Sequence, residues 1–252
     1  MVLPLYDDNS DRQTTPYVNY AIIALNIFVF VVLQGLGTNE QFTYAFSTVP
    51  QEILTGTDVV TASHVITDPV TGQRFLSPGL GYTPISVYLT LFTSMFMHGG
   101  LAHLGGNMLF LWIFGDNIED RLGHVRYTIF YLLCGLIASL SHVFVTAAFA
   151  GEQADMLVPS LGASGAISGV LGGYILLHPS RRVTVILFRF LTDVPAWVAI
   201  GIWFAFQLIS GLGMLGGGSQ QGGVAYAAHV GGFLAGLVLI KFFDRGHAGT
   251  RI

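Results

Sequence analysis

The chain has 252 residues, of which 52% are hydrophobic and only 10% are charged, and its formal net charge is -4. Soluble globular domains carry about 25% charged residues, so this composition excludes an ordinary water-soluble enzyme and favours a membrane protein. Lys and Arg number only 10 and form no basic cluster, which excludes the phosphate attraction behind nucleic-acid binding.

A polar, acidic segment, residues 1–16, begins the chain and lacks the basic start and small-residue cleavage site of a secretory signal peptide. A bilayer core about 30 Å thick requires about 20 apolar residues per helix, or fewer where protein surrounds the helix. Six stretches fit this requirement: roughly Tyr17–Leu36, Leu101–Ile118, Tyr127–Phe149, Ser164–Leu177, Pro195–Leu212 and Ala225–Phe243. They predict an all-α, six-helix membrane bundle in a single domain over residues 1–252, with its core at about 90–243 and a cytoplasmic tail at 244–252.

The segment from Gly37 to about Phe96 separates the first two predicted helices. It is too long for a simple hairpin, and it mixes apolar residues with turn sequences such as Pro78-Gly79. We expect this long outer loop to lie partly in the outer membrane interface.

Basic residues predict the orientation of the bundle. With six helices both termini share one side, and placing that side in the cytoplasm leaves only Arg74 outside. The cytoplasmic side then holds the other basic residues: Arg12, Arg121, Arg126, Arg181, Arg182, Arg189, Lys241, Arg245 and Arg251. The positive-inside rule predicts this asymmetry. We therefore expect a multi-pass protein of the plasma (cell inner) membrane, surrounded by lipid bilayer, with both termini cytoplasmic.

The fourth predicted helix opens with Gly162-Ala163-Ser164-Gly165. Glycines flanking a serine permit a tight turn into a helix, which leaves the serine Oγ accessible and nearby backbone N–H groups free to bind an oxyanion. This setting suits a nucleophile. The same small residues also suit plain helix packing in membranes, and a lone motif of this kind more often does only that.

His229 lies in the sixth predicted helix, with Gly232 and Gly236 on the same helical face. The fourth helix offers a matching stripe of glycines: Gly165, Gly169 and Gly173. Two such stripes predict tight packing of the two helices, which would bring the His229 imidazole near the Ser164 hydroxyl. A lone membrane histidine serves packing or hydrogen bonding as often as catalysis, and its pairing with a serine favours catalysis.

The depth of these two residues agrees with a shared site. At about 1.5 Å per residue, Ser164 is about 25 Å from Arg181 and His229 about 18 Å from Lys241. Both distances place the side chains in the outer half of a core about 30 Å thick. Because the fourth helix is too short to cross alone, we expect the loop before it to line a cavity that admits water from outside.

A third polar cluster contains His98, His103 and Asn107. His103 and Asn107 are four residues apart on one helical face, and both can donate hydrogen bonds, so they suit an oxyanion hole. Interhelical hydrogen bonding is the plainer alternative. A metal site would need more ligands than the histidines His98, His103 and His229, and no carboxylate or cysteine completes the set, so we expect no metal and no other cofactor. The outer half of the predicted helices holds no Asp or Glu to orient His229, which predicts a Ser-His dyad rather than a triad.

These motifs, in this order, resemble those of the rhomboid family of intramembrane serine proteases. The similarity runs from about Thr90 to Phe243, and the combination of motifs is specific. The resemblance implies Ser164 as nucleophile, His229 as general base, and His103 and Asn107 as oxyanion donors. It also implies a structural role for the polar end of the second helix, which includes Gly115, Glu119 and Arg121.

The resemblance further implies a serine endopeptidase that hydrolyses peptide bonds in or near the transmembrane segments of membrane proteins. Its substrates would be single-span proteins cut near the outer end of a helix that unwinds easily. One position departs from the family pattern. Many members carry an aromatic residue four positions after the nucleophile, which stacks on the catalytic histidine, whereas this chain has Ser168.

Two alternatives belong to other functional classes. A non-catalytic rhomboid-like protein would bind membrane proteins without cleaving them, but such relatives usually lose the serine or histidine or carry a proline beside the serine. A six-span transporter would normally show an internal repeat, and the sequence contains none that we find. Neither the substrate nor the oligomeric state follows from the sequence.

Overall fold

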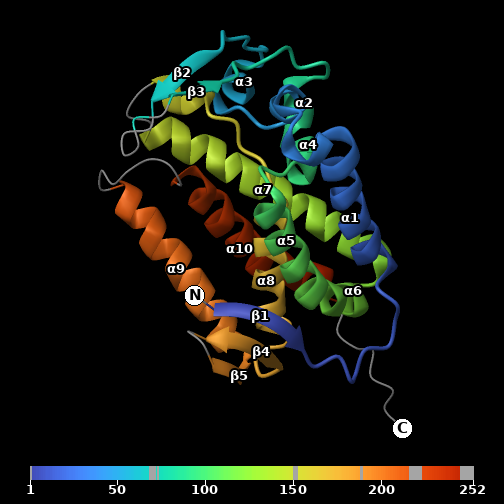
Figure 1. The fold of residues 1–252 in the computed structure, drawn as a ribbon. Helices are drawn as coiled ribbons and strands as arrows, with labels where there is room; N and C mark the ends of the chain where they lie inside the picture. The colour runs from blue at the N-terminus through green and yellow to red at the C-terminus, as the bar shows by residue number, and fades with distance from the viewer. Residues whose placement is uncertain are drawn as a thin grey trace.

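A bundle of long helices forms the body of the protein (Figure 1). The computed structural model describes residues 2–67, 72, 74–149, 153–187, 190–215 and 223–244. The label η marks helical turns that are not α-helical, which are π-helical in η1 and η5 and 3-10 in the others. The long helices are α1 (Tyr17–Phe28) with η1 (Val29–Leu33), α5 (Leu101–Phe110) with η5 (Leu111–Gly115) and α6 (Asp116–Leu122), α7 (His124–Phe149), α8 (Ser164–Leu177), α9 (Ala196–Leu215) and α10 (Gly223–Phe243).

Helices occupy each of the six apolar stretches that the sequence predicts to be helical. Among the described residues, two of them are long and apolar enough to cross a membrane alone, namely His124–Phe149 and Tyr226–Phe243. The apolar parts of the other helices are shorter, which agrees with the rule that helices surrounded by protein need not match the bilayer thickness.

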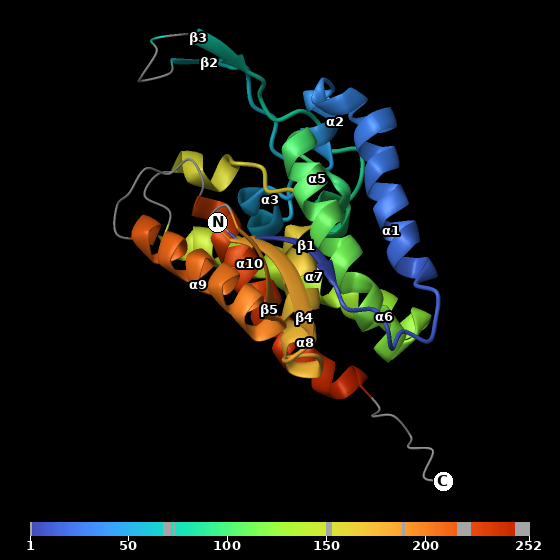
Figure 2. The same cartoon turned by 60° about the horizontal axis from the view of Figure 1, so that its bottom comes forward.

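The segment between α1 and α5 folds into short elements at one end of the bundle. These are η2 (Gly35–Gly37), α2 (Glu40–Ala45), α3 (Pro50–Thr55), β2 (His64–Thr67), β3 (Arg74–Ser77), η3 (Val87–Leu89), α4 (Thr90–Thr93) and η4 (Ser94–Phe96). Strands β2 and β3 form an antiparallel hairpin that projects from the body of the molecule (Figure 2). A further short helix, η6 (Gln153–Leu157), follows α7.

The expectation of an all-α protein is wrong in one respect, because a three-stranded antiparallel sheet lies at the other end of the bundle (Figure 1). It consists of β1 (Val2–Asp7), β4 (Arg182–Leu187) and β5 (Phe190–Pro195) in the order β1-β4-β5. Val, Thr and Ile in β4 favour extended backbone. The predicted polar N-terminal segment therefore begins as a strand paired with the connection between α8 and α9.

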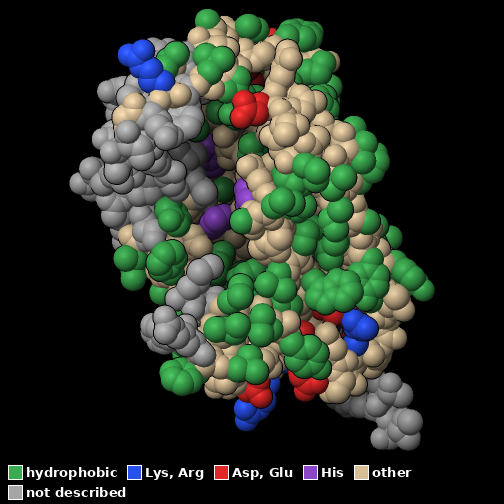
Figure 3. Space-filling view, viewed as in Figure 1, with side chains coloured by type: hydrophobic (Ala, Val, Ile, Leu, Met, Phe, Trp, Pro, Cys, Tyr) green, Lys and Arg blue, Asp and Glu red, His purple; other side chains and the backbone are tan. Residues whose placement is uncertain are grey.

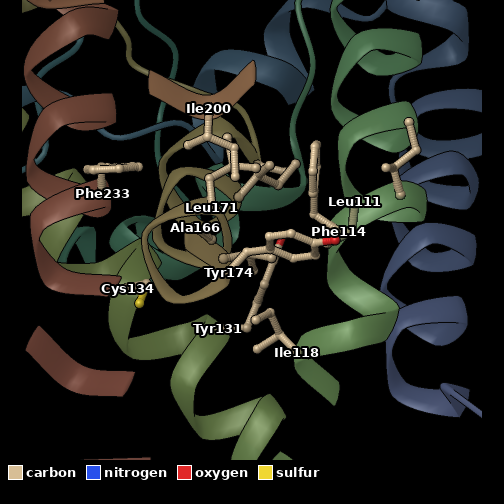
Figure 4. Close-up of a cluster of buried hydrophobic side chains, with 14 of the residues drawn as sticks. Leu111, Phe114, Ile118, Tyr131, Cys134, Ala166, Leu171, Tyr174, Ile200 and Phe233 are labelled. Carbon is tan, nitrogen blue, oxygen red and sulfur yellow. The ribbon is translucent and has the colours of Figure 1, made fainter. Parts of the chain in front are cut away.

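Helix α8 packs against both α7 and α10, which also pack against each other. Figure 4 shows side chains from several helices gathered around it, including Leu111 and Phe114 of η5, Ile200 of α9 and Phe233 of α10. Tyr174 of α8 packs edge-on against Phe114, with ring centroids 5.0 Å apart. Close packing of these large side chains against one another fixes the position of α8 among its neighbours.

The sheet is tied into the apolar core by Pro4 of β1. Pro4 lines a small apolar cavity together with residues of η5, α8 and α9, among them Phe114, Leu171 and Trp203. Strand β1 therefore packs between helices that are far apart in sequence, and it connects η5 with α9.

Buried polar contacts hold the N-terminal segment at the same end of the molecule. Asp7 is 1% exposed and accepts hydrogen bonds from the Tyr174 hydroxyl at 2.6 Å and from Asn117 Nδ2 at 2.7 Å. Arg181, after α8, pairs with Asp11 at 2.5 Å. These contacts link residues before α1 with the end of the central helix.

The polar end of the second predicted helix has a structural role here. Glu119 is fully buried and accepts hydrogen bonds from the backbone N–H groups of Val18 and Asn19, at 2.9 and 2.6 Å. These are first-turn groups of α1 that have no partner within their own helix. Arg121 pairs with Asp244 through two hydrogen bonds, at 2.8 and 3.0 Å. Glu119 thus caps α1, and Arg121 fixes the end of α10.

Candidate active site

The turn into α8 places Ser164 at the first position of the helix. Gly162 has a φ of +123°, a backbone conformation that only glycine adopts readily. Its N–H donates to the carbonyl of Ser94 at 2.8 Å, and the preceding Ser160 pairs with Thr48 through backbone hydrogen bonds of 2.9 and 2.8 Å. The segment between α1 and α5 therefore holds the loop that leads to Ser164.

Ser164 and His229 are in direct contact although 65 positions separate them in the chain. The distance between Ser164 Oγ and His229 Nε2 is 2.7 Å, which is the length of a strong hydrogen bond. Figure 3 shows histidine side chains in a hollow near the middle of the face seen in Figure 1. A serine hydroxyl bonded to an imidazole nitrogen is the arrangement in which the base can remove the hydroxyl proton.

Glycines allow α8 and α10 to approach closely enough for this contact, as the two stripes predict. A Cβ added to Gly232 would lie 2.1 Å from the carbonyl oxygen of Gly165, and one added to Gly236 would lie 2.0 Å from that of Gly169. Neither position has room for a side chain. The predicted stripe on α8 differs in one detail, because a Cβ at Gly172 would meet backbone of α10 at 2.2 Å.

His103 of α5 lies beside the turn that precedes Ser164. The Gly99 N–H donates to His103 Nδ1 at 3.4 Å, so the neutral ring carries its proton on Nε2. A Cβ added to Gly162 would lie 2.8 Å from His103 Nε2 and 3.7 Å from Ser164 Oγ. The space that Gly162 leaves free thus has the serine oxygen on one side and an N–H donor on the other.

Asn107 lies one turn after His103 on α5 and is 8% exposed. Its Nδ2 is 3.0 Å from His98 Nε2, so the amide donates to that ring. Gln34 in turn binds the backbone of His98, donating to its carbonyl at 2.9 Å and accepting from its N–H at 2.9 Å. Asn107 and Gln34 thus form a hydrogen-bonded unit around His98, and the His103 ring lies edge-on to His98 with centroids 5.1 Å apart. The second amide proton of Asn107 can bind another partner.

A sequence profile described as the Rhomboid domain matches residues 86–245, which is more than half of the chain. The chain belongs to the rhomboid family. The two membrane-length helices agree with the integral membrane character of rhomboids.

Individual rhomboids show the same relationship. Rhomboid protein 1, mitochondrial, of Saccharomyces cerevisiae is 32% identical over 150 residues, covering 60% of this chain and 40% of the relative. Rhomboid protease GluP of Bacillus subtilis is 28% identical over 206 residues, covering 80% of this chain and 33% of the relative. Presenilin-associated rhomboid-like protein A, mitochondrial, of Danio rerio is 31% identical over 173 residues, covering 68% and 42%. The chain thus spans well under half the length of these curated relatives.

In this rhomboid the position four residues after Ser164 has a local role. Ser168 Oγ donates to the Ser164 carbonyl at 2.6 Å, within the first turn of α8. Two aromatic rings that are not on α8 lie near the His229 ring instead, Trp203 on α9 and Tyr226 on the histidine's own helix α10. The Trp203 centroid is 6.0 Å from that of His229, and the Tyr226 centroid is 6.5 Å away with the rings perpendicular.

The sequence predicts no carboxylate to orient His229, and the structure places a neutral amide against the ring. His229 Nδ1 is 2.9 Å from Gln207 Oε1 on α9. A neutral amide such as Gln207 does not follow from the absence of carboxylates in the sequence, so the sequence did not predict this contact. Gln207 is a polar residue within an apolar stretch, and that signal alone makes it a candidate functional residue.

Metal ligands were the other interpretation of the histidines. Within the part of the chain that the structure describes, no group of three or more His, Cys, Asp or Glu side chains could hold one ion.

Proposed function

We propose that this rhomboid is an intramembrane serine endopeptidase in which Ser164 is the nucleophile and His229 the general base. The observation that carries the proposal is the 2.7 Å hydrogen bond between Ser164 Oγ and His229 Nε2. The family supports the reaction type, because one of its members similar to this chain is the Rhomboid protease GluP.

The reaction follows from this geometry. Ser164 Oγ attacks the carbonyl carbon of a substrate peptide bond while His229 Nε2 takes the hydroxyl proton. The resulting imidazolium donates that proton to the leaving amine, the C–N bond breaks, and the acyl group stays esterified to Ser164. Water then attacks the ester with His229 again as base, which releases the new carboxylate and restores the hydroxyl.

Stabilisation of the oxyanion is assigned to His103, Asn107 and the backbone N–H of Ser164. His103 Nε2–H borders the space next to Ser164 Oγ that Gly162 leaves open. The N–H groups of the first turn of α8 have no partner within the helix, and they point toward its N-terminal end, where Ser164 lies. Donors fixed in advance need no rearrangement when negative charge develops on the carbonyl oxygen.

Six membrane crossings with both termini in the cytoplasm fit this chemistry. Ser164 begins a helix of 14 residues, which is about 21 Å long and shorter than the bilayer core. The site then lies in the outer half of the membrane, and the β2–β3 hairpin lies on the outer side. We assign the protein to the plasma membrane, although two of the relatives named above are described as mitochondrial.

The substrates proposed are membrane proteins with a transmembrane segment that unwinds near its outer end. Carbonyl groups inside a regular helix are hydrogen-bonded and shielded, so a local loss of helical structure must precede attack. No cofactor takes part in the steps described.

Cleavage of a labelled transmembrane substrate by the detergent-purified protein tests the proposal. We expect Ser164→Ala to lower the cleavage rate by at least about 1,000-fold, because the attacking atom is removed. Labelling by a serine-directed fluorophosphonate should be lost in Ser164→Ala and strongly slowed in His229→Ala. Substrate binding without cleavage, with no labelling of Ser164, would instead indicate the non-catalytic rhomboid-like class.

A further inference from the structure

Helix α9 carries one buried amide in a strongly apolar sequence. Gln207 lies between Phe206 and Leu208 and is 8% exposed. A buried amide in an apolar environment is costly unless it is hydrogen-bonded. Its partner is the imidazole of His229, at 2.9 Å between Gln207 Oε1 and His229 Nδ1. Among the described contacts of Gln207, the hydrogen bond to His229 is therefore the one that offsets the free-energy cost of burying its amide.

This hydrogen bond determines which ring nitrogen carries the proton. An amide oxygen can only accept, so His229 Nδ1 must be the protonated nitrogen. Nε2 then presents its lone pair to the Ser164 hydroxyl at 2.7 Å. In the other tautomer Nε2 would hold a proton and could not accept one from Ser164.

Helix α9 also places an aromatic ring beside the same imidazole. Trp203 precedes Gln207 by one turn, and its ring centroid is 6.0 Å from that of His229. Residues four apart lie on one face of a helix, so α9 presents an acceptor and an aromatic surface together. With Ser168 in place of the aromatic residue common in rhomboids, α9 supplies the contacts that orient the histidine.

We propose that Gln207 is a positioning residue that orients His229 and fixes its tautomer, so that the dyad operates with a neutral third member. The inference rests on the proposed protease function. Gln207 does not touch the reacting atoms, and it acts only through the imidazole. An uncharged amide performs this role without placing a carboxylate in the apolar part of α9.

Three variants of the full-length detergent-purified protein test this role. Gln207→Leu removes the acceptor at similar volume, Gln207→Glu keeps an acceptor oxygen at the same reach, and Phe206→Leu changes an exposed neighbour on the same helix. For Gln207→Leu we expect kcat to fall about 10- to 1,000-fold with KM within about twofold of wild type. The kcat of Gln207→Glu should be at least about tenfold higher than that of Gln207→Leu. Phe206→Leu should have a kcat and a KM close to those of wild type.

A spectroscopic measurement reports the tautomer without requiring activity. In protein labelled with 15N-histidine, the His229 signals are identified by their loss in His229→Ala. The wild type should show a protonated Nδ1 and an unprotonated Nε2, and Gln207→Leu should shift the ring toward a mixture of tautomers. This readout would not change if Gln207 only filled space.

The outcomes separate the two proposals. A wild-type His229 protonated on Nε2, or a kcat for Gln207→Leu within twofold of wild type, would overturn the positioning role of Gln207. An inactive wild type that still shows the Nδ1-protonated ring, lost in Gln207→Leu, would reject the protease function and retain the role of Gln207 in orienting the histidine.

Discussion

Gly162 combines an unusual backbone conformation with a position beside Ser164, the proposed nucleophile. Its φ is +123°, and a Cβ there would overlap the His103 ring at 2.8 Å. In Gly162→Ala both the turn into α8 and the His103 imidazole must shift. We expect kcat for substrate cleavage to fall at least about tenfold, because the donor and the nucleophile lose their relative geometry.

Gly201→Ala is the matched control for that measurement, since a Cβ at Gly201 meets nothing within 4 Å. It should leave both kcat and the apparent unfolding temperature close to those of wild type. If Gly162→Ala also cleaved at the wild-type rate, the space beside Ser164 would not serve the reaction.

The residues of the candidate site differ in how far the sequence could predict them. The contact between Ser164 and His229 was predictable, because glycine stripes beside both residues require their helices to touch. The contact of Gln207 with His229 was not predictable, because a neutral amide on a neighbouring helix has no sequence motif that links it to the histidine. The binding of Asn107 to His98 depends on the side-chain directions within one helical turn, which sequence spacing alone does not determine.

Among the elements, strand β1 has the least expected position. Its anchor Asp7 is buried, and burial, assisted by the nearby Asp116, raises the pKa of the Asp7 carboxyl to about 7 despite the hydrogen bond from Tyr174. The unfolded chain has the ordinary value of 3.8. Because the folded protein binds this proton more tightly, the contribution of Asp7 to stability is largest below about pH 4 and is lost as the pH rises through about 7.

Thermal unfolding in detergent between pH 5 and pH 8 measures this effect. Wild type should lose stability relative to Asp7→Asn as the pH rises, by at most about 1.4 kcal/mol per pH unit below pH 7. Comparing the two proteins cancels the contribution of titrating groups that do not interact with Asp7. Asp11→Asn removes an exposed carboxylate of the same segment and should keep the wild-type slope. Parallel curves for wild type and Asp7→Asn would show that Asp7 does not titrate in this range.

The long helices were predictable at this scale and the strands were not. A run of about 20 apolar residues has few alternatives to a helix in a membrane. Strand β4 has six residues, and its partner β1 lies at the start of the chain, so local sequence gives no sign of the pairing. The end of α9 also differs from expectation, since the helix continues to Leu215 rather than ending near Leu212.

For the whole molecule, the proposed orientation places the two sheets on opposite sides of the membrane. Leu76 in β3 and Leu191 in β5 are 70% and 67% exposed, at opposite ends of the bundle (Figure 1). In intact cells a membrane-impermeant maleimide should label Leu76→Cys, whereas Leu191→Cys should react only after the membrane is permeabilised. The unmodified chain is the control, because its Cys134 is fully buried. Labelling of both variants from outside would contradict the six-span arrangement.

The positions of the basic residues that the structure describes agree with that orientation. Arg12, Arg121 and Arg181 form ion pairs near the three-stranded sheet, and Arg74 lies in the hairpin at the other end. Arg189, Arg245 and Arg251, which also belong to the predicted cytoplasmic set, lie outside the described residues. The positive-inside pattern thus corresponds to a real separation between two ends of the bundle.

Trp203 has neighbours in two parts of the molecule that the chain order keeps far apart. One side of it shares a cavity with Pro4, in the first strand, and its ring centroid is 6.0 Å from that of His229, the proposed general base. A single indole thus has Pro4 as a neighbour in one cavity and the His229 ring as a neighbour on another side. Any partner that pulled strand β1 away from the bundle would therefore remove packing from α9, the helix that carries Trp203 and Gln207 beside His229.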